Sequence, residues 1–289
     1  MSWRAIHFYI HDIKFHTIFL TKYLKPLIAE LQQKRILRRY FYIIYWQGGN
    51  HIRFRYVSDR EQEAKELLIR CYQEFLQSYV PGEVLDEATY YRIYANNKEQ
   101  VTQLQWVADG QYLEIPYEPE YTRYGGTRAL TYSENVFQCS SDYALCILEE
   151  AGNRFGVRLF AALDMMRIAL KEIEDKEEFL IQYDQFWRKF NGQEEESEAS
   201  IRKLYEKYWD QNRWAGEGRV SFYDTWQEQL HQNLTEAIRV QDTFDHGKQA
   251  KNLILASLLH MNHNRLGIYP RYESILARIM LMHREEVMI

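Results

Sequence analysis

The stretch His51-Ile52-Arg53-Phe54-Arg55-Tyr56 decides the fold that we expect for this chain. Apolar and polar side chains alternate strictly along it, so it predicts a β-strand that carries His51, Arg53 and Arg55 on one face. At two positions apart on a strand, the two guanidinium groups lie roughly 7 Å from each other. That spacing suits the binding of carboxylates, because each arginine offers a rigid fork of donors and keeps its charge.

The sequence before this strand argues that the arginine pair is a site. An isolated pair of this kind is more often the solvated face of a half-exposed strand. Here the very apolar stretch Tyr40–Trp46 comes first and is joined to it through Gln47–Asn50, which is a hairpin turn signal. Two arginines in a central hairpin need an explanation, and we interpret them as part of a site.

The elements around the hairpin predict an α+β fold. They are a strand at Trp3–His11, a helix over 17–34 with Pro26 as a possible kink, a helix at Glu61–Ser78 and a fourth strand at Ala88–Tyr94. This order is that of a ferredoxin-like, split-βαβ antiparallel sheet. Residues 95–117 are expected to add hairpin material, with a turn at Asp109-Gly110 before a strand at Gln111–Ile115.

The second half of the chain has helical periodicity almost throughout. We expect helices near 128–151, 157–173, 176–191, 197–210, 221–241, 247–263 and 270–285. Because no low-complexity linker separates the halves, an α+β portion (1–126) and a helical portion (127–289) are predicted to pack as one unit.

Composition and charge limit the classes of function. The hydrophobic fraction of 46% and the aromatic fraction of 15% describe a globular protein, and no apolar run is long enough for membrane insertion. Three cysteines without metal-type spacing predict reduced thiols in the cytoplasm.

Charge is unevenly distributed along the chain. Residues 1–60 carry eleven Lys or Arg and three Asp or Glu, so their net charge is +8, whereas that of the whole chain is −5. This asymmetry points to an anionic ligand, although a chance surface feature competes with it, and no RNA-binding signature favours direct contact with nucleic acid.

A histidine lies at the end of the apolar penultimate helix, in the stretch Leu258–Gly267. His260 shares a helix face with Asn264, and Met261 shares one with Arg265. A buried, hydrogen-bonded histidine is the commoner explanation of His260 when it is considered alone. His263 follows at i+3, but no acidic or cysteine cluster accompanies the pair, so we expect no metal site and no cofactor.

Several motifs in this order resemble the C-terminal elimination domain of class I lantibiotic dehydratases and its stand-alone, thiopeptide-type relatives. The resemblance spans nearly the whole chain and rests on Trp3 in the first strand, His51–Arg55, Tyr117–Glu120 leading into Arg123–Gly126, Asn135–Asp142 and His260–Gly267. It implies a lyase that removes glutamate from glutamylated Ser or Thr of a ribosomally made precursor peptide, leaving dehydroalanine or dehydrobutyrine. The implied catalytic residues are Arg53, Arg55, Arg123 and His260, and the implied substrate-binding residues are His51, Tyr124 and Arg265.

Two departures place the chain beside the stand-alone branch. The sequence carries no glutamylation domain, so a separate glutamyl-tRNA-dependent protein is implied as partner, and Pro119 stands where lantibiotic versions often carry an arginine. The same branch includes pyridine synthases, which join two dehydroalanines in a formal [4+2] cycloaddition and are expected to lack the elimination arginines and histidine. Elimination is therefore the first hypothesis, cycloaddition the second, and a peptide-binding scaffold the third. Each is compatible with an oligomer.

Overall fold

The computed structural model describes residues 2–82, 85–94, 105–192, 196–208, 217–245 and 248–287. These residues divide into two compact units, Met1–Pro119 with Ala144–Arg154, and Glu120–Tyr143 with Phe155–Ile289. The division expected at residue 126, and the packing of the two halves as one unit, stay predictions.

The first unit is built on a four-stranded antiparallel sheet. Its strands are β1 (Arg4–Tyr9), β2 (Leu37–Tyr45), β3 (His51–Ser58) and β4 (Tyr112–Glu114), in the order β2-β3-β1-β4. The strand predicted from the opening motif is confirmed as β3, which lies in the interior of the sheet between β2 and β1. Its register places Arg53 opposite His7 of β1 and Ile43 of β2.

The strand expected at 88–94 is wrong, because this segment forms the helix α4 (Glu87–Tyr94). Asp86 caps the helix by accepting hydrogen bonds from the backbone N–H and the hydroxyl of Thr89. The buried Tyr90 hydroxyl then donates to the Trp46 carbonyl oxygen. Cap and anchor together override the β propensity of the aromatic run. The fourth strand is β4, which follows the expected turn at Asp109-Gly110, while residues 95–104 lie outside the described ones.

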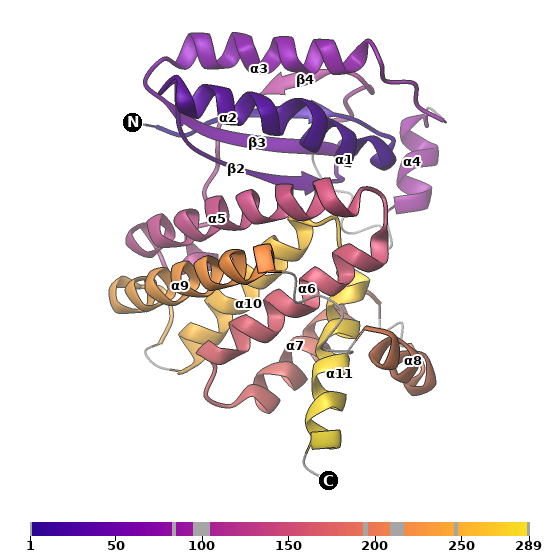
Figure 1. The fold of residues 1–289 in the computed structure, drawn as a ribbon, viewed down its shortest axis with the longest axis vertical. Coiled ribbons are helices and arrows are strands. Elements are labelled where there is room, and N and C mark those ends of the chain that lie inside the picture. The colour runs from indigo at the N-terminus through magenta and orange to yellow at the C-terminus, as the bar shows by residue number, and fades with distance from the viewer. Residues whose placement is uncertain are drawn as a thin grey trace. The chain divides into compact units, whose positions relative to one another are not determined.

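Helices cover one face of this sheet. They are α1 (His16–Ile18), the π-helical η2 (Phe19–Leu24), α2 (Lys25–Gln33) and α3 (Glu61–Leu76), preceded by a 3₁₀ turn, η1 (Ile13–Phe15), and α2 and α3 lie along the same face in Figure 1. Phe8 of β1 packs on Phe19 and Tyr72 of these helices, with ring centroids 5.2 and 4.9 Å away. Because side chains alternate along β3, the polar face of Arg53 and Arg55 points away from this core.

The helix over 16–33 continues through Pro26 after one widened turn. Pro26 lacks the N–H that would bond the carbonyl four residues earlier, and Lys25 N–H donates five residues back, to Leu20. In place of the expected kink, the structure has the π-helical turn η2, which ends two residues before Pro26.

The second unit is helical, as predicted. Its helices are α5 (Thr127–Ala151, in this unit to Tyr143), α6 (Phe155–Ala169), α7 (Lys176–Phe190), α8 (Glu198–Tyr208), α9 (Glu217–Val240), α10 (Lys248–Arg265) and α11 (Pro270–Val287), with 3₁₀ turns η4 (Thr122–Tyr124) and η5 (Leu170–Glu172). The α10 side chains Leu255, Leu258 and Leu259 are buried in its core, with Met165 of α6 and Leu276 of α11. This packing fixes α10 and places His260 near its end.

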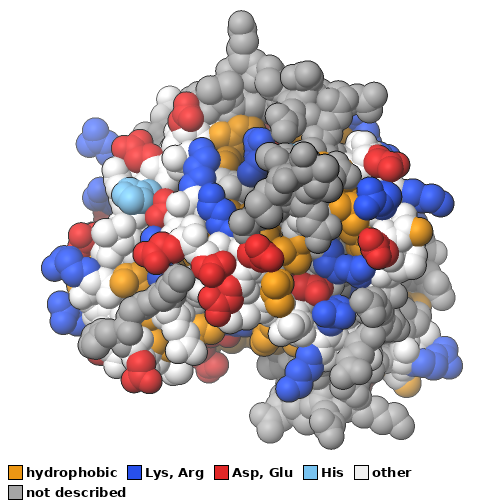
Figure 2. Space-filling model, turned by 90° about the horizontal axis from the view of Figure 1, so that it is seen from below, with side chains coloured by type: hydrophobic (Ala, Val, Ile, Leu, Met, Phe, Trp, Pro, Cys, Tyr) orange, Lys and Arg blue, Asp and Glu red, His pale blue; other side chains and the backbone are white. Residues whose placement is uncertain are grey.

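The face shown in Figure 2 has acidic and basic side chains interspersed, with smaller apolar areas between them. None of the described helices combines the length and the apolar character that a membrane span requires.

Candidate functional site

In the first unit, Arg53 is held in a defined orientation on the polar face of β3. Its Nε donates to Nε2 of His51 at 3.0 Å, and Nδ1 of His51 lies 2.7 Å from the Gly49 carbonyl oxygen. Because Nε2 accepts, His51 carries its proton on Nδ1 and donates it to Gly49. The Arg53 guanidinium lies 3.6 Å from the ring centroid of Tyr45, which fixes its plane.

Two buried imidazoles adjoin this arginine without adding charge. The rings of His7 and His51 stack at 5.1 Å, and the two side chains are 5% and 0% exposed. Burial, followed by the charges of Arg53 and Arg55, lowers the pKa of His7 to about 3. Burial and Arg53 likewise hold the pKa of His51 well below its usual value. The arginines therefore supply the positive charge of this face at neutral pH.

Arg55 lies among aromatic rings from β2 and from two of the predicted motifs. Its guanidinium is 5.3 Å from the Phe41 ring centroid and 5.0 Å from that of Tyr117. Trp3 meets both rings edge-on, at 4.8 and 6.1 Å. The structure thus brings together Trp3, the arginine strand and the start of the Tyr117–Glu120 motif, three segments that are far apart in sequence.

In the second unit, the Arg123–Gly126 motif forms a tight turn. Gly125 and Gly126 have positive φ angles of 83° and 98°, and a Cβ on Gly126 would lie 1.9 Å from Oδ1 of Asp242. The backbone of Asp242 donates to the Gly125 carbonyl oxygen at 3.1 Å. The turn therefore requires glycine at these two positions, because both have positive φ angles and the backbone packs directly against Asp242 in the segment after α9.

The two functional candidates of this turn have different surroundings. Nη1 of Arg123 lies 3.2 Å from both carboxylate oxygens of Glu120, and its side chain is 38% exposed. Tyr124 is buried, with its ring 5.0 Å from that of Phe137 on α5. Arg123 therefore has a local carboxylate partner at the surface, while Tyr124 anchors the turn in the core.

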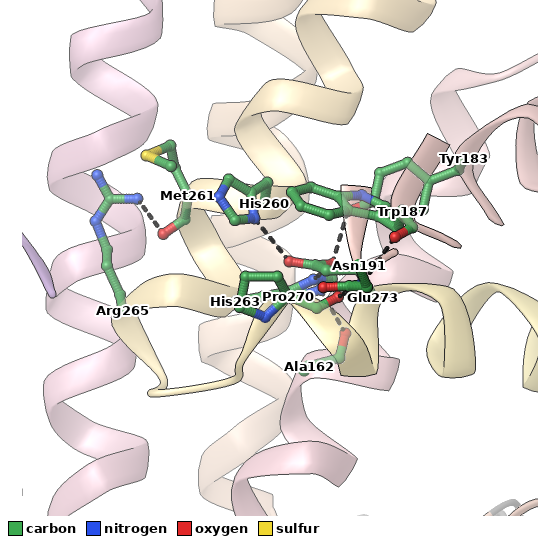
Figure 3. A network of polar contacts seen from close by, with 10 residues as sticks. All are labelled: Ala162, Tyr183, Trp187, Asn191, His260, Met261, His263, Arg265, Pro270 and Glu273. Carbon is green, nitrogen blue, oxygen red and sulfur yellow. Dashed lines mark hydrogen bonds and ion pairs between the residues drawn. The ribbon is translucent and has the colours of Figure 1, made fainter. Parts of the chain in front are cut away.

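His260 bonds to a carboxylate that the sequence analysis missed. Its Nδ1 lies 2.9 Å from Oε1 of Glu273 in the first turn of α11, and its ring packs on Trp187 of α7 at 4.5 Å (Figure 3). The His260 side chain is 15% exposed, whereas Glu273 is fully buried. An imidazole anchored in this way through Nδ1 keeps Nε2 for exchange of a proton.

Glu273 is the centre of a wider network (Figure 3). Its Oε2 lies 2.5 Å from Nδ1 of His263 and accepts from the Tyr183 hydroxyl at 2.7 Å. Burial alone would raise the pKa of Glu273, but the charge of His263 and the hydrogen bond from His260 outweigh it and lower the pKa to about 2. The carboxylate is therefore ionised although it is buried.

A signal for Glu273 was present in the sequence. It shares a helix face with Leu276, Ala277 and Met280 at i+3, i+4 and i+7, all of which are buried. A carboxylate on the apolar face of a helix needs a partner, and this periodicity indicates that need without naming His260 or His263 as the partner.

Arg265 is fully buried at the end of α10. Its Nε donates to the Ser141 hydroxyl at 3.0 Å and its Nη1 to the Met261 carbonyl oxygen at 2.8 Å. Its guanidinium lies 5.1 Å from the ring centroid of Phe137, so it connects α10 to α5. Its expected role in substrate binding stays a prediction.

The candidates fall into two groups. Arg53 and Arg55 belong to the first unit, and Arg123 and His260 to the second. Their convergence on one cleft stays a prediction. Among the residues that the structure describes, no three His, Cys, Asp or Glu side chains are arranged to hold a metal ion.

Comparison with known proteins gives a family match and three similar folds. The model of the family described as lantibiotic biosynthesis dehydratase C-term matches residues 3–283. No curated protein matches the sequence.

The pyridine synthase TbtD from thiomuracin biosynthesis has a TM-score of 0.72 and 12% identity, with 99% of each chain covered. TsrL has a TM-score of 0.66 and 14% identity, over 98% of this chain and 95% of that one. The tRNA-dependent lantibiotic dehydratase MibB from Microbispora sp. 107891 has a TM-score of 0.59 and 16% identity, over 99% of this chain and 28% of that one. At these identities the solved structures establish a shared fold.

Proposed function

The chain belongs to the lantibiotic biosynthesis dehydratase C-terminal family, and we propose that it eliminates glutamate from glutamyl esters of Ser or Thr in a ribosomally made precursor peptide. The product is dehydroalanine or dehydrobutyrine. A separate glutamyl-tRNA-dependent protein supplies the ester, and elimination then makes this chain a lyase.

The pairing of His260 with Glu273 is the observation that carries the proposal. The contact through Nδ1, at 2.9 Å, leaves Nε2 of His260 to act as a base. In the reaction a base removes the Cα proton of the esterified residue. The electron pair of that C–H bond forms the Cα=Cβ double bond, the Cβ–O bond breaks, and glutamate leaves with its α-carboxylate.

The arginines of β3 fit the binding of the leaving group. Glutamate departs with a developing negative charge and keeps a second carboxylate in its side chain, and arginine forks bind carboxylates through paired hydrogen bonds. His51 and Tyr45 hold Arg53 in a fixed orientation, so little reorganisation accompanies the developing charge. We include Arg123 and the aromatic neighbours of Arg55 among the residues of the proposed active site.

Cycloaddition is the second candidate, and the match to the pyridine synthase TbtD over 99% of both chains favours it. It would join two dehydroalanines in a formal [4+2] cycloaddition, and members of that group are expected to lack the elimination arginines and histidine. The retained arginines and the His260–Glu273 pair therefore favour elimination.

Two structural features agree with the fold and the cellular environment that we propose. The strand order β2-β3-β1-β4, with helices after β1 and after β3, agrees with a ferredoxin-like, split-βαβ arrangement. Cys71, Cys139 and Cys146 are free thiols, which agrees with a reducing, cytoplasmic environment.

The test offers the purified chain two panels of synthetic peptides. One panel carries a single glutamyl-Ser ester in varied flanking sequences, and the other carries two dehydroalanines. Elimination predicts release of glutamate from the first panel and no reaction with the second. Formation of a cyclised product from the second panel alone establishes cycloaddition. Binding of both panels without reaction of either leaves a peptide-binding scaffold and refutes the enzyme.

A further inference from the structure

We infer that Glu273 is a positioning residue that holds His260 as the Nδ1–H tautomer, while a doubly protonated His263 neutralises the carboxylate. The inference deepens the proposed function and rests on it for its kinetic consequence. The tautomer itself can be measured whether or not the protein eliminates glutamate.

The first step is the number of donors on one carboxylate. Glu273 lies 2.9 Å from Nδ1 of His260, 2.5 Å from Nδ1 of His263 and 2.7 Å from the Tyr183 hydroxyl. An ionised carboxylate accepts hydrogen bonds and has none to donate. Both imidazoles face Glu273 through Nδ1, so both must carry a proton on that nitrogen.

The second step separates the two histidines. Nε2 of His263 lies 3.3 Å from the Ala162 carbonyl oxygen, which is also an acceptor. Both nitrogens of this ring thus face acceptors, and the side chain is 0% exposed, so no solvent competes with them. Only the doubly protonated imidazolium can donate to both. His263 and Glu273 form a buried ion pair with no net charge.

The third step concerns His260. Because His263 already balances the carboxylate, His260 can remain neutral, with its one proton on Nδ1. No described residue forms a hydrogen bond with its Nε2, and Trp187 holds the ring at 4.5 Å between centroids. Free histidine in water prefers the Nε2–H tautomer, so the Glu273 contact selects the form whose Nε2 carries a lone pair. That is the form a base requires.

Histidine nitrogen NMR on the full chain tests the assignment. We expect wild-type protein at neutral pH to show His260 with an unprotonated Nε2 and His263 with both nitrogens protonated, the signals being assigned with His260→Gln and His263→Gln. An Nε2–H signal for neutral His260 in the wild-type protein would overturn the inference, and this measurement needs no variant of Glu273.

A Glu273→Gln variant then tests the cause. The amide offers one carbonyl oxygen to two Nδ1–H groups, so at least one histidine must give up its Nδ1 proton and its signals must change. Glu172→Gln is the matched control, because Glu172 accepts from Nδ1 of the exposed His231 at 3.1 Å in the same unit. Unchanged signals of both His260 and His263 in a folded Glu273→Gln variant would also overturn the inference.

Kinetics connect the tautomer to the proposed function. Loss of the residue that sets a catalytic histidine's tautomer lowers kcat by about 10⁴ in the serine protease triad, so we expect a fall of about 10²–10⁴ for Glu273→Gln with little change in KM. Glu273→Asp should recover part of it. A wild-type Nε2–H tautomer with active elimination refutes the positioning role alone. The expected tautomer in a protein that releases no glutamate refutes the proposed function alone.

Discussion

Replacing Arg53 by Lys separates a two-pronged guanidinium from a simple positive charge. In the structure Arg53 donates through Nε to His51 at 3.0 Å, and its guanidinium lies 3.6 Å from the Tyr45 ring centroid. A lysine ammonium keeps the charge but has no Nε–H and no planar fork. It cannot keep the contact with His51 and also present paired donors to a carboxylate.

The magnitude follows from what is lost. Removing one preorganised donor that stabilises developing charge typically lowers the rate by about 10²–10³, or about 2.7–4 kcal/mol in the barrier. The hydrogen bond to His51 contributes about 1 kcal/mol to folding and the contact with Tyr45 about 0.5–2 kcal/mol. We therefore expect kcat/KM to fall by two to three orders of magnitude, while the protein stays folded and loses at most about 3 kcal/mol of stability.

The assay measures glutamate released from the glutamyl-Ser peptide by mass spectrometry, together with urea unfolding. Arg4→Lys is the matched control, because Arg4 lies in the neighbouring strand, pairs in register with Tyr56 and bonds the exposed Glu61 at 2.8 Å. If Arg53→Lys eliminates within about tenfold of the wild-type rate, the fork has no part in the reaction and the argument from Arg53 fails.

Two further predictions concern stability. Burial is the main cause that lowers the pKa of His7 to about 3 and of His16 to about 4, so between these values and about 6.5 the unfolded chain binds more protons than the folded one. Stability should therefore fall as pH drops below about 6.5, by about 2 kcal/mol for each histidine at pH 5, and urea unfolding that is unchanged between neutral pH and pH 5 would contradict this. Gly126→Ala should destabilise by about 1–3 kcal/mol, because its Cβ would lie 1.9 Å from Asp242 Oδ1 at a positive φ, whereas Gly152→Ala, with no atom within 4 Å, tests the cost of a positive φ alone. Equal losses of melting temperature in the two alanine variants would exclude the contact with Asp242.

Local periodicity determined most of the elements. The alternation around Arg53 predicts β3 because side chains on a strand repeat every two residues, and the apolar stripes after residue 127 predict the helices because side chains on a helix repeat every 3.6. The same reasoning failed at Ala88–Tyr94, where β-favouring side chains form the helix α4. There, a cap at Asp86 and the burial of Tyr90 outweigh a weak intrinsic preference.

The sequence by itself determined which residue types are present for the chemistry: arginines on one face of a strand, a histidine at the end of an apolar helix, and two glycines in a turn. Only the tertiary structure decided their partners. Glu273 meets His260 because α11 folds back after Gly267, and residues 13 positions apart then share one buried site. Helical periodicity states which face a residue occupies but not which helix covers that face. The carboxylate that orients His260 therefore emerges only when the helices pack.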